Sequence, residues 1–248
     1  MELNNRLYDI FMGKAKELKV EKVTLGLGYT AVETSDGGIG ISYTYFESKK
    51  MCSFNKSYFD YEGGSALPLL ENIKSSDTIQ RSMALALINA LNYKDALLLP
   101  EDQSNNIMFD EFGIHEGKKV AMVGFFGPLV KIFKAKKVAL EIIDKSRSLG
   151  CEEDLYKKLG NWAEVLLITS TSILNNTTED ILLMVGKDVK TIMLGPSTPM
   201  VGEAIEHLPV HMLAGTVVIK RDGVLKAIRH GAGTPVIHKY SRKSYLRI

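Results

Sequence analysis

The stretch Lys119-VAMVGFFGPLV-Lys131 decides the architecture of the second half of the chain. Its first apolar residues, 120–123, form a short run ended by glycine, which is typical of a strand buried on both faces. Gly127-Pro128 follow three residues after Gly124. A dinucleotide-binding turn has the spacing G-x-G-x-x-G, whereas these two glycines are spaced G-x-x-G and a proline comes after the second. The stretch therefore predicts a strand-to-helix turn without the usual dinucleotide fingerprint.

Similar strand-like runs recur along the rest of the chain, at residues 138–143, 165–169, 191–194 and 215–219. Helical or loop segments separate them, notably residues 152–160 and 178–185. Near-continuous apolar strands that alternate with helices indicate a parallel sheet covered on both faces. We therefore predict an α/β fold in which residues 118–248 form a Rossmann-like domain with a mainly parallel sheet.

The chain before this domain has a different order of elements. Residues 3–18 have the apolar spacing of a helix, and two strand-like runs, 22–33 and 39–46, flank the hairpin signal Ser35-Asp36-Gly37-Gly38. Ser75-Ser76-Asp77 offers N-cap oxygens to a helix that ends near Asn92. We predict a small α+β domain over residues 1–93. Residues 94–117 are polar with weak periodicity, so we interpret them as a linker.

Composition limits the environment and the partners. The 248 residues are 45% hydrophobic and 24% charged with a net charge of +2, so bulk charge favours no particular partner. The basic residues from Lys220 onward lack the interleaved aromatic residues of nucleic-acid binding and predict a solvated surface. Two distant cysteines, Cys52 and Cys151, fit a reducing cytosol. No signal-peptide pattern occurs, and no apolar run reaches the ~18 residues of a membrane span. We expect a cytoplasmic protein with no nucleic-acid or membrane partner, and a homo-oligomer is compatible with this composition.

Ligands of open α/β sheets bind outside the carboxyl ends of the strands, and three turns there are rich in candidate residues. Residues 169–178 alone hold six Ser or Thr and two Asn. The candidate ligand-binding residues of the three turns are Gly124, Phe125, Phe126, Gly127, Thr169, Thr171, Asn175, Gly195, Pro196, Ser197 and Thr198. Each also has a structural explanation, because glycines can serve close packing and hydroxyls between two prolines can form a rigid turn. Their coincidence at one sheet edge predicts a polar pocket.

Asn89 is the candidate from the N-terminal domain. It interrupts the apolar helical run LALINAL, and a buried amide needs hydrogen-bond partners. We predict that it joins the three turns in an inter-domain cleft, and a structural role, capping a neighbouring loop, is the alternative.

Catalytic and metal-binding patterns are scarce. His207 and His211 have i,i+4 spacing, but Pro209 between them disfavours the continuous helix that such a zinc pair needs. No G-x-S-x-G, phosphate-loop or H-E-x-x-H pattern occurs, so the residues name no catalytic group and no cofactor. No Lys or Arg falls within residues 162–184 or 192–217, which disfavours a highly charged ligand.

Five segments occur in a characteristic order: GLGYTAV at 26–32, ALALINA at 84–90, VGFFGP at 123–128, ITST through NNT at 168–177, and GPSTP at 195–199. Together they resemble a prokaryotic family labelled "putative heavy-metal chelation", over nearly the whole chain. The resemblance implies an enolase N-terminal-like domain before a Rossmann-like domain, with a cleft between them as the active site. It also implies condensation or hydrolysis of a pterin-, flavin- or siderophore-like molecule that serves metal handling. Because the chain has no Cys/His cluster, chelation would mean making or processing a chelator.

Three classes of function stay open. The first is an enzyme acting on a heterocyclic or catechol-like small molecule, and the second is a module that binds a metal–chelator complex without turnover. The third is a Rossmann-type methyltransferase, with Glu141 or Asp144 on the ribose. The phenylalanines of Gly124-Phe125-Phe126-Gly127 offer an apolar wall, whereas a pyrophosphate prefers free N–H groups at a helix N-terminus, one of which Pro128 removes. We therefore expect a small planar heterocycle as the partner, which the resemblance suggests is a chelator.

Overall fold

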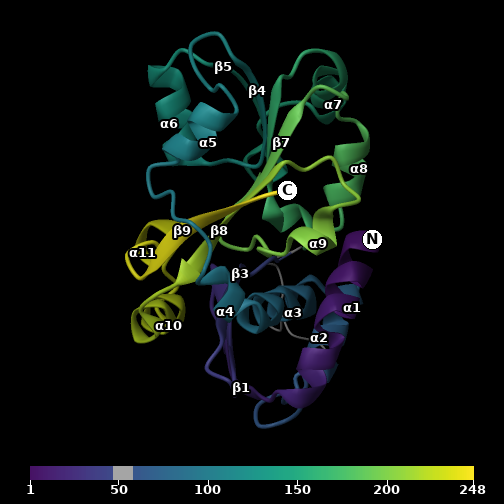
Figure 1. Ribbon diagram of the computed structural model, residues 1–248, viewed down its shortest axis with the longest axis vertical. Helices are drawn as coiled ribbons and strands as arrows, with labels where there is room; N and C mark the ends of the chain where they lie inside the picture. Colours follow the sequence, from purple (N-terminus) through teal and green to yellow (C-terminus); the bar gives the residue numbers. More distant parts are fainter. Residues whose placement is uncertain (47–57) are drawn as a thin grey trace.

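The computed structural model describes residues 1–46 and 58–248, so Cys52 lies outside the described residues. The lower half of Figure 1 is an α+β unit around a three-stranded antiparallel sheet. Its elements are α1 (Glu2–Glu17), β1 (Val20–Leu25), β2 (Tyr29–Thr34), β3 (Ile39–Tyr43), α2 (Leu67–Glu71), the 3-10 helix η1 (Asn72–Lys74), α3 (Thr78–Leu91) and α4 (Tyr93–Ala96).

Most of the expected elements of this unit are confirmed. The helix predicted over residues 3–18 is α1, and β2 pairs with β3 across the predicted hairpin turn. Asp77 caps α3, because its carboxylate accepts hydrogen bonds from the N–H groups of Ile79 and Gln80 at 2.8 and 3.3 Å. The single strand expected over residues 22–33 is wrong, since Gly26-Leu27-Gly28 separates β1 from β2. A Cβ at Gly26 would lie 2.5 Å from the carbonyl oxygen of Ile228, so another helix packs directly on the backbone at this turn.

The upper half is an α/β unit whose six strands lie in the order β5-β4-β6-β7-β8-β9. All neighbours are parallel except β9, which runs antiparallel to β8, so the mainly parallel sheet is confirmed. Its elements are α5 (Asn106–Glu111), β4 (Lys119–Val123), α6 (Gly127–Ala135), β5 (Ala139–Ile143), η2 (Lys145–Arg147), α7 (Glu152–Asn161), β6 (Val165–Thr169), η3 (Ser170–Ser172), α8 (Thr178–Leu183), β7 (Lys190–Leu194), α9 (Gly202–Ile205), β8 (Met212–Val218), α10 (Arg221–Arg229), α11 (Thr234–Ile237) and β9 (Ser241–Arg247).

The edge strand β9 was not expected from the sequence. Its residues SRKSYLR are mostly polar, and they form a strand because all seven pair in register with β8, from Met212↔Arg247 to Val218↔Ser241. β8 itself begins at Met212, three residues earlier than predicted. The pairing brings polar and basic side chains of β9 beside an otherwise apolar sheet.

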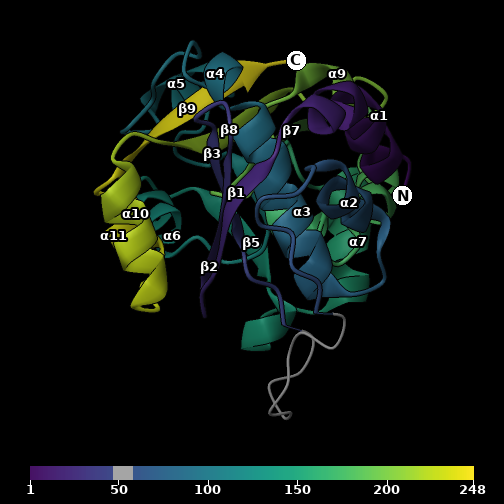
Figure 2. The ribbon, with the colours of Figure 1, turned by 90° about the horizontal axis from the view of Figure 1, so that it is seen from below.

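The two units share their cores instead of sitting apart. α10 and α11 belong to the second half of the chain, yet they cover one face of the three-stranded sheet while α3 covers the other (Figure 2). Arg221 at the start of α10 stabilises this packing, because it forms an ion pair with the buried Glu33 of β2 at 3.1 Å and donates a hydrogen bond to the Gly37 carbonyl at 2.7 Å. Helix α1 in turn packs against α9, and one apolar cluster runs from α1 and α3 into the α/β unit.

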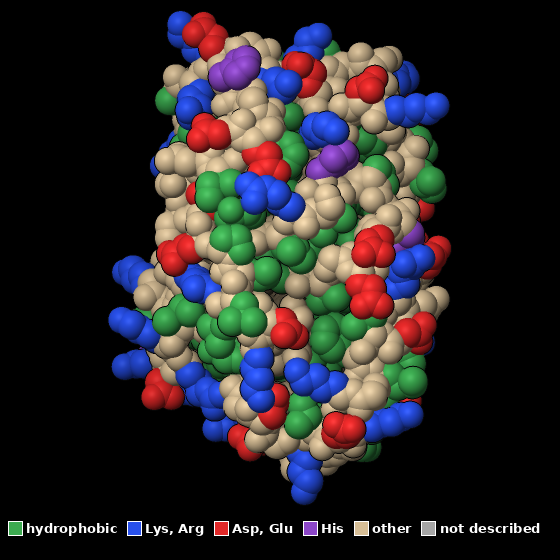
Figure 3. All heavy atoms as spheres, in the orientation of Figure 1, with side chains coloured by type: hydrophobic (Ala, Val, Ile, Leu, Met, Phe, Trp, Pro, Cys, Tyr) green, Lys and Arg blue, Asp and Glu red, His purple; other side chains and the backbone are tan. Residues whose placement is uncertain are grey.

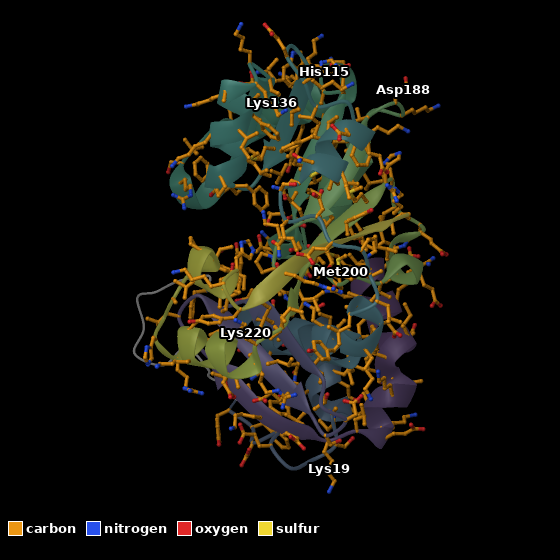
Figure 4. The ribbon with its side chains drawn as sticks, turned by 60° about the vertical axis from the view of Figure 1, so that its left-hand side comes forward. Lys19, His115, Lys136, Asp188, Met200 and Lys220 are labelled. Carbon is orange, nitrogen blue, oxygen red and sulfur yellow. The ribbon has the colours of Figure 1, made fainter. Side chains whose placement is uncertain are left out.

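The segment 94–117 is packed and partly helical. Helix α5 buries Met108 and Phe109, and Phe112, the residue after this helix, is also buried. The rings of Phe109 and Phe133 pack edge to face with their centres 5.8 Å apart. Met200 lies at the junction between the two units. In Figure 4 it is in the middle of the molecule, between His115 at one end and Lys19 at the other. The amide of the buried Asn92 donates to the Met200 carbonyl at 2.9 Å.

The surface carries both signs of charge. Lys and Arg side chains gather over α10 and α11, at the lower left of Figure 3. None of the described helices is long and apolar enough to cross a membrane.

Candidate functional site

The strand order puts the topological switch point of the sheet at the ends of β4 and β6. The chain leaves β4 toward β5 on one side and returns to β6 on the other, so the connections diverge between these two strands. In doubly wound sheets this switch point is where ligands bind. Gly124 follows β4 with φ +95°, and a Cβ there would lie 2.9 Å from the Cβ of Thr169. Glycine is therefore required where the two strand ends meet.

A cavity of about 880 Å³ opens at this point, between the two units. The α/β unit supplies the turns after β4, β6 and β7, and the α+β unit supplies three tyrosines from β2, β3 and the residues after it: Tyr29, Tyr43 and Tyr45. The third wall comes from β8, α11 and β9. The volume is in the range of small-molecule and cofactor sites.

Most of the predicted site residues lie on the walls of this cavity. Those that line it are Gly124, Phe125, Phe126, Thr169, Thr171, Asn175, Gly195, Pro196 and Ser197. Gly127, Thr198 and Asn89 are described residues that do not line it. The three strand-end turns thus come together as the parallel sheet requires, although whether they bind a ligand stays a prediction.

Two polar side chains near the cavity, Ser197 and Asn89, hold the two units together. The Ser197 hydroxyl accepts from the Tyr43 N–H at 2.7 Å, and the Asn89 amide donates to the carbonyls of Ile41 at 2.9 Å and Ser197 at 3.4 Å. The Thr198 hydroxyl donates to the Ala214 carbonyl at 3.1 Å. The turn after β7 is therefore anchored to β3 and β8 by these bonds.

The turn after β6 has a different character. The Thr169 and Thr171 hydroxyls bond to each other at 3.0 Å, and Asn175 accepts from the Thr177 hydroxyl at 2.7 Å. Asn175 is exposed, so a ligand at this turn would meet its amide in contact with solvent. Ser170 is only 1% exposed, and its hydroxyl has no hydrogen-bond partner among residues 1–46 and 58–248. A buried hydroxyl without a partner is costly, and Ser170 lines the cavity.

Aromatic rings form the walls on both sides. Tyr29 packs edge to face on Tyr43 with ring centres 6.1 Å apart, and Tyr43 packs on Tyr45 at 6.4 Å. Burial raises the pKa of Tyr29, whose hydroxyl bonds to Thr234 at 2.6 Å. On the opposite wall the guanidinium of Arg147 lies 4.8 Å from the centre of the Phe125 ring, a cation–π arrangement.

The basic side chains of the site and His238 were not expected from the sequence. Lys145, Arg147, His238 and Lys243 line the cavity from η2, α11 and β9, outside the segments searched for basic residues. The expectation that a charged ligand is disfavoured therefore rested on a wrong premise. Burial lowers the pKa of His238, and the neighbouring charge of Lys243 lowers it further, so this imidazole is neutral near pH 7. No local pattern in SRKSYLR over residues 241–247 marks Lys243, because the strand that carries it forms by pairing with β8.

The two candidates for a ribose partner are separated by the structure. Glu141 is paired with Lys158 at 2.7 Å and does not line the cavity. Asp144 does line it, and its carboxylate accepts from the Arg147 N–H at 3.1 Å. Asp144 is thus the acidic group that a ligand at the switch point would meet.

Direct metal coordination finds little support in the described residues, where no group of three His, Cys, Asp or Glu is placed to hold an ion. His207 and His211 follow α9, which ends at Ile205, and His211 Nδ1 accepts from the Thr191 N–H at 3.1 Å. That folding needs no bound metal stays a prediction.

The fold and the cavity define a class of protein: a small α+β unit interlocked with a doubly wound α/β unit, with one large ligand-sized cavity at the switch point between them. Residues 8–92 and 107–247 match two sequence families that share the description "Putative heavy-metal chelation". The chain belongs to this family.

Similar proteins carry the same architecture. An uncharacterised protein of Methanocaldococcus jannaschii is 23% identical over 269 aligned positions, which cover 98% of this chain and 95% of that protein. A crystal structure of a protein of unknown function from Pyrococcus horikoshii superposes with a TM-score of 0.82 at 22% identity, covering 100% of both chains. One from Desulfitobacterium hafniense has a TM-score of 0.73 at 17% identity, covering 98% of this chain and 99% of that one. These likenesses establish the fold.

Proposed function

We propose that the protein binds a flat aromatic small molecule of the pterin, flavin or catechol kind in the inter-unit cavity, and that it serves metal handling through this ligand. The observation that carries the proposal is the unsatisfied hydroxyl of Ser170, buried in the wall of a cavity that five Tyr and Phe rings of the described residues also line: Tyr29, Tyr43, Tyr45, Phe125 and Phe126. A ring system with oxygen or nitrogen atoms at its edge satisfies such a hydroxyl while its faces pack on Tyr and Phe rings.

The lining supports a ring more than a simple nucleotide phosphate. Tyr29, Tyr43, Tyr45, Phe125 and Phe126 supply large flat surfaces, whereas Pro128 removes an N–H group at the start of α6. A metal bound by such a ligand would need no His or Cys cluster in the protein. This separates the proposal from direct chelation by side chains.

Calorimetric titration with neopterin, riboflavin and catechol tests the proposal. We expect one of them to bind with a 1:1 stoichiometry, and Ser170→Ala to weaken that binding by about 1–3 kcal/mol. Ser76→Ala, which replaces an exposed serine just before α3, is the matched control and should bind like the wild type. Failure of all three compounds to bind, or equal affinity in Ser170→Ala, would show that the proposal is wrong.

A second candidate, an enzyme that condenses or hydrolyses the ligand, is favoured by His238. Its imidazole lines the cavity and is kept neutral by burial, which is the state a general base needs. Incubation of the bound compound with wild type and His238→Gln, followed by mass spectrometry, separates the two. A product formed by the wild type and lost in the variant supports the enzyme, and an unchanged compound supports a binding protein.

A further inference from the structure

Lys243 is a basic group of the cavity wall whose hydrogen-bond partners are neutral. It lies on β9 opposite Thr216 of β8, and both residues line the cavity. Its ammonium donates to the Gln103 carbonyl at 3.1 Å and to the amide oxygen of Asn105 at 3.4 Å. Among the ion pairs of the described residues none includes Lys243, whereas Arg147 pairs with Asp144 at 3.9 Å and stacks on Phe125.

The acidic group that attracts this ammonium forms no ion pair with it among the described residues. Asp102 is the carboxylate that attracts Lys243, but its Oδ2 accepts from the Met108 N–H at 3.2 Å and so caps the first turn of α5. Burial lowers the pKa of Lys243 and outweighs the opposing attraction of Asp102. A half-buried cation whose charge is incompletely balanced faces a cavity in which His238 is neutral.

We propose that Lys243 binds an acidic group, a carboxylate or a phosphate, attached to the aromatic ligand, so that the natural ligand is an aromatic acid anion. The inference rests on the proposed function and narrows its substrate class. An ammonium with two neutral oxygen partners keeps a third N–H for an anionic oxygen, and hydrogen bonds between charged groups are about twice as strong as neutral ones. In this arrangement tyrosine and phenylalanine side chains pack on the rings of the ligand, Ser170 hydrogen-bonds to the ring edge, and Lys243 binds the acidic group.

Matched pairs of compounds that differ by the acid test this directly. Catechol and 2,3-dihydroxybenzoate differ by a carboxylate, and riboflavin and flavin mononucleotide differ by a phosphate. We expect wild type to prefer the acid-bearing member of one pair by about tenfold or more, as for a charge-assisted hydrogen bond. The pair that shows the preference tells which acid the site recognises.

Variants then assign the preference to one side chain. Lys243→Met should bind both members of the pair alike, and Lys243→Arg should restore part of the preference. Lys239→Met, which removes an exposed lysine just before β9, should keep the full preference. Melting curves check that each variant is folded.

The outcomes separate the two proposals. If wild type binds the neutral and acidic members equally, the acid site does not exist although the ring site stands, and this result needs no variant. A preference that persists undiminished in Lys243→Met assigns the acid to another group and also overturns the inference. If no member of either pair binds, the proposed function fails, and the inference fails with it.

Discussion

Replacing Gly124 by alanine tests whether glycine is required where β4 and β6 end. The new methyl group would lie 2.9 Å from both Cβ and Cγ2 of Thr169, closer than carbon atoms pack, and φ is +95°. Positive φ costs a non-glycine residue about 1–2 kcal/mol. Forcing an extra methyl group into packed surroundings costs on the order of 1–3 kcal/mol more. Alanine also leaves the unfolded chain fewer conformations than glycine does, which stabilises the folded state by about 0.4–1 kcal/mol and offsets part of these two costs.

Gly37→Ala is the matched control, because Gly37 has φ +83° but a Cβ there would meet nothing within 4 Å. It should carry the backbone strain alone, so we expect Gly124→Ala to lose about 1–3 kcal/mol more unfolding free energy than Gly37→Ala. For a chain of this size that is a further fall in melting temperature of roughly 2–12 °C. Thermal melts and urea titrations of the two variants measure the difference. Equal losses would refute the argument that close approach to Thr169 fixes this glycine.

Three further predictions follow from the contacts around the cavity. Asn89→Ala should lower the unfolding free energy by about 1–3 kcal/mol, because the Ile41 carbonyl loses its partner, and should leave ligand affinity almost unchanged; a large affinity loss in calorimetry would contradict this. If S-adenosyl compounds bind at all, Asp144→Asn should weaken them and Glu141→Gln should not, since only Asp144 lines the cavity, and the reverse order in the same titration would show that the site is misplaced. The folded-state pKa values of His238 and His211 are lowered below the ordinary 6.5, so the unfolded chain binds more protons and stability should fall as pH drops below about 6.5. Urea titrations at several pH values between 4 and 8 give the unfolding free energy at each pH. This free energy should fall less steeply with decreasing pH in His238→Gln than in the wild type, and an identical pH dependence would contradict the burial argument.

The elements that could be predicted well from the sequence are those whose apolar residues follow the regular spacing of one helix or one strand. The helix α1, the hairpin β2–β3 and the apolar strands β4, β6 and β7 follow from local pattern alone, and their turns meet at one edge because the sheet is parallel. β9 could not be predicted in this way, because a polar stretch becomes a strand only through its pairing with β8. Lys243 was missed for the same reason, since it reaches the cavity on that strand.

The site residues show the same limit. Ser197 and Asn89 were recognised as unusual, but sequence cannot tell whether a polar group meets a ligand or a neighbouring carbonyl, and here both meet backbone groups. Ser170 stood among six hydroxyl residues of one segment, and only its burial without a partner distinguishes it. The packing of α10 on the N-terminal sheet likewise depends on contacts between residues far apart in the chain.

Because of that packing, the N-terminal sheet can reach its native structure only late in protein synthesis. The outer face of the N-terminal sheet, with Ala31 and Ile41, is covered by α10 and α11, and α10 begins at Arg221, 180 residues after Ile41. At the usual pace of protein synthesis, that distance takes roughly 10–40 s to translate. During this interval the apolar face of the nascent sheet has no native cover, so it needs protection from neighbouring chains on the polysome. A chain that stops short of α10 therefore leaves the ribosome with this apolar face of the N-terminal sheet uncovered.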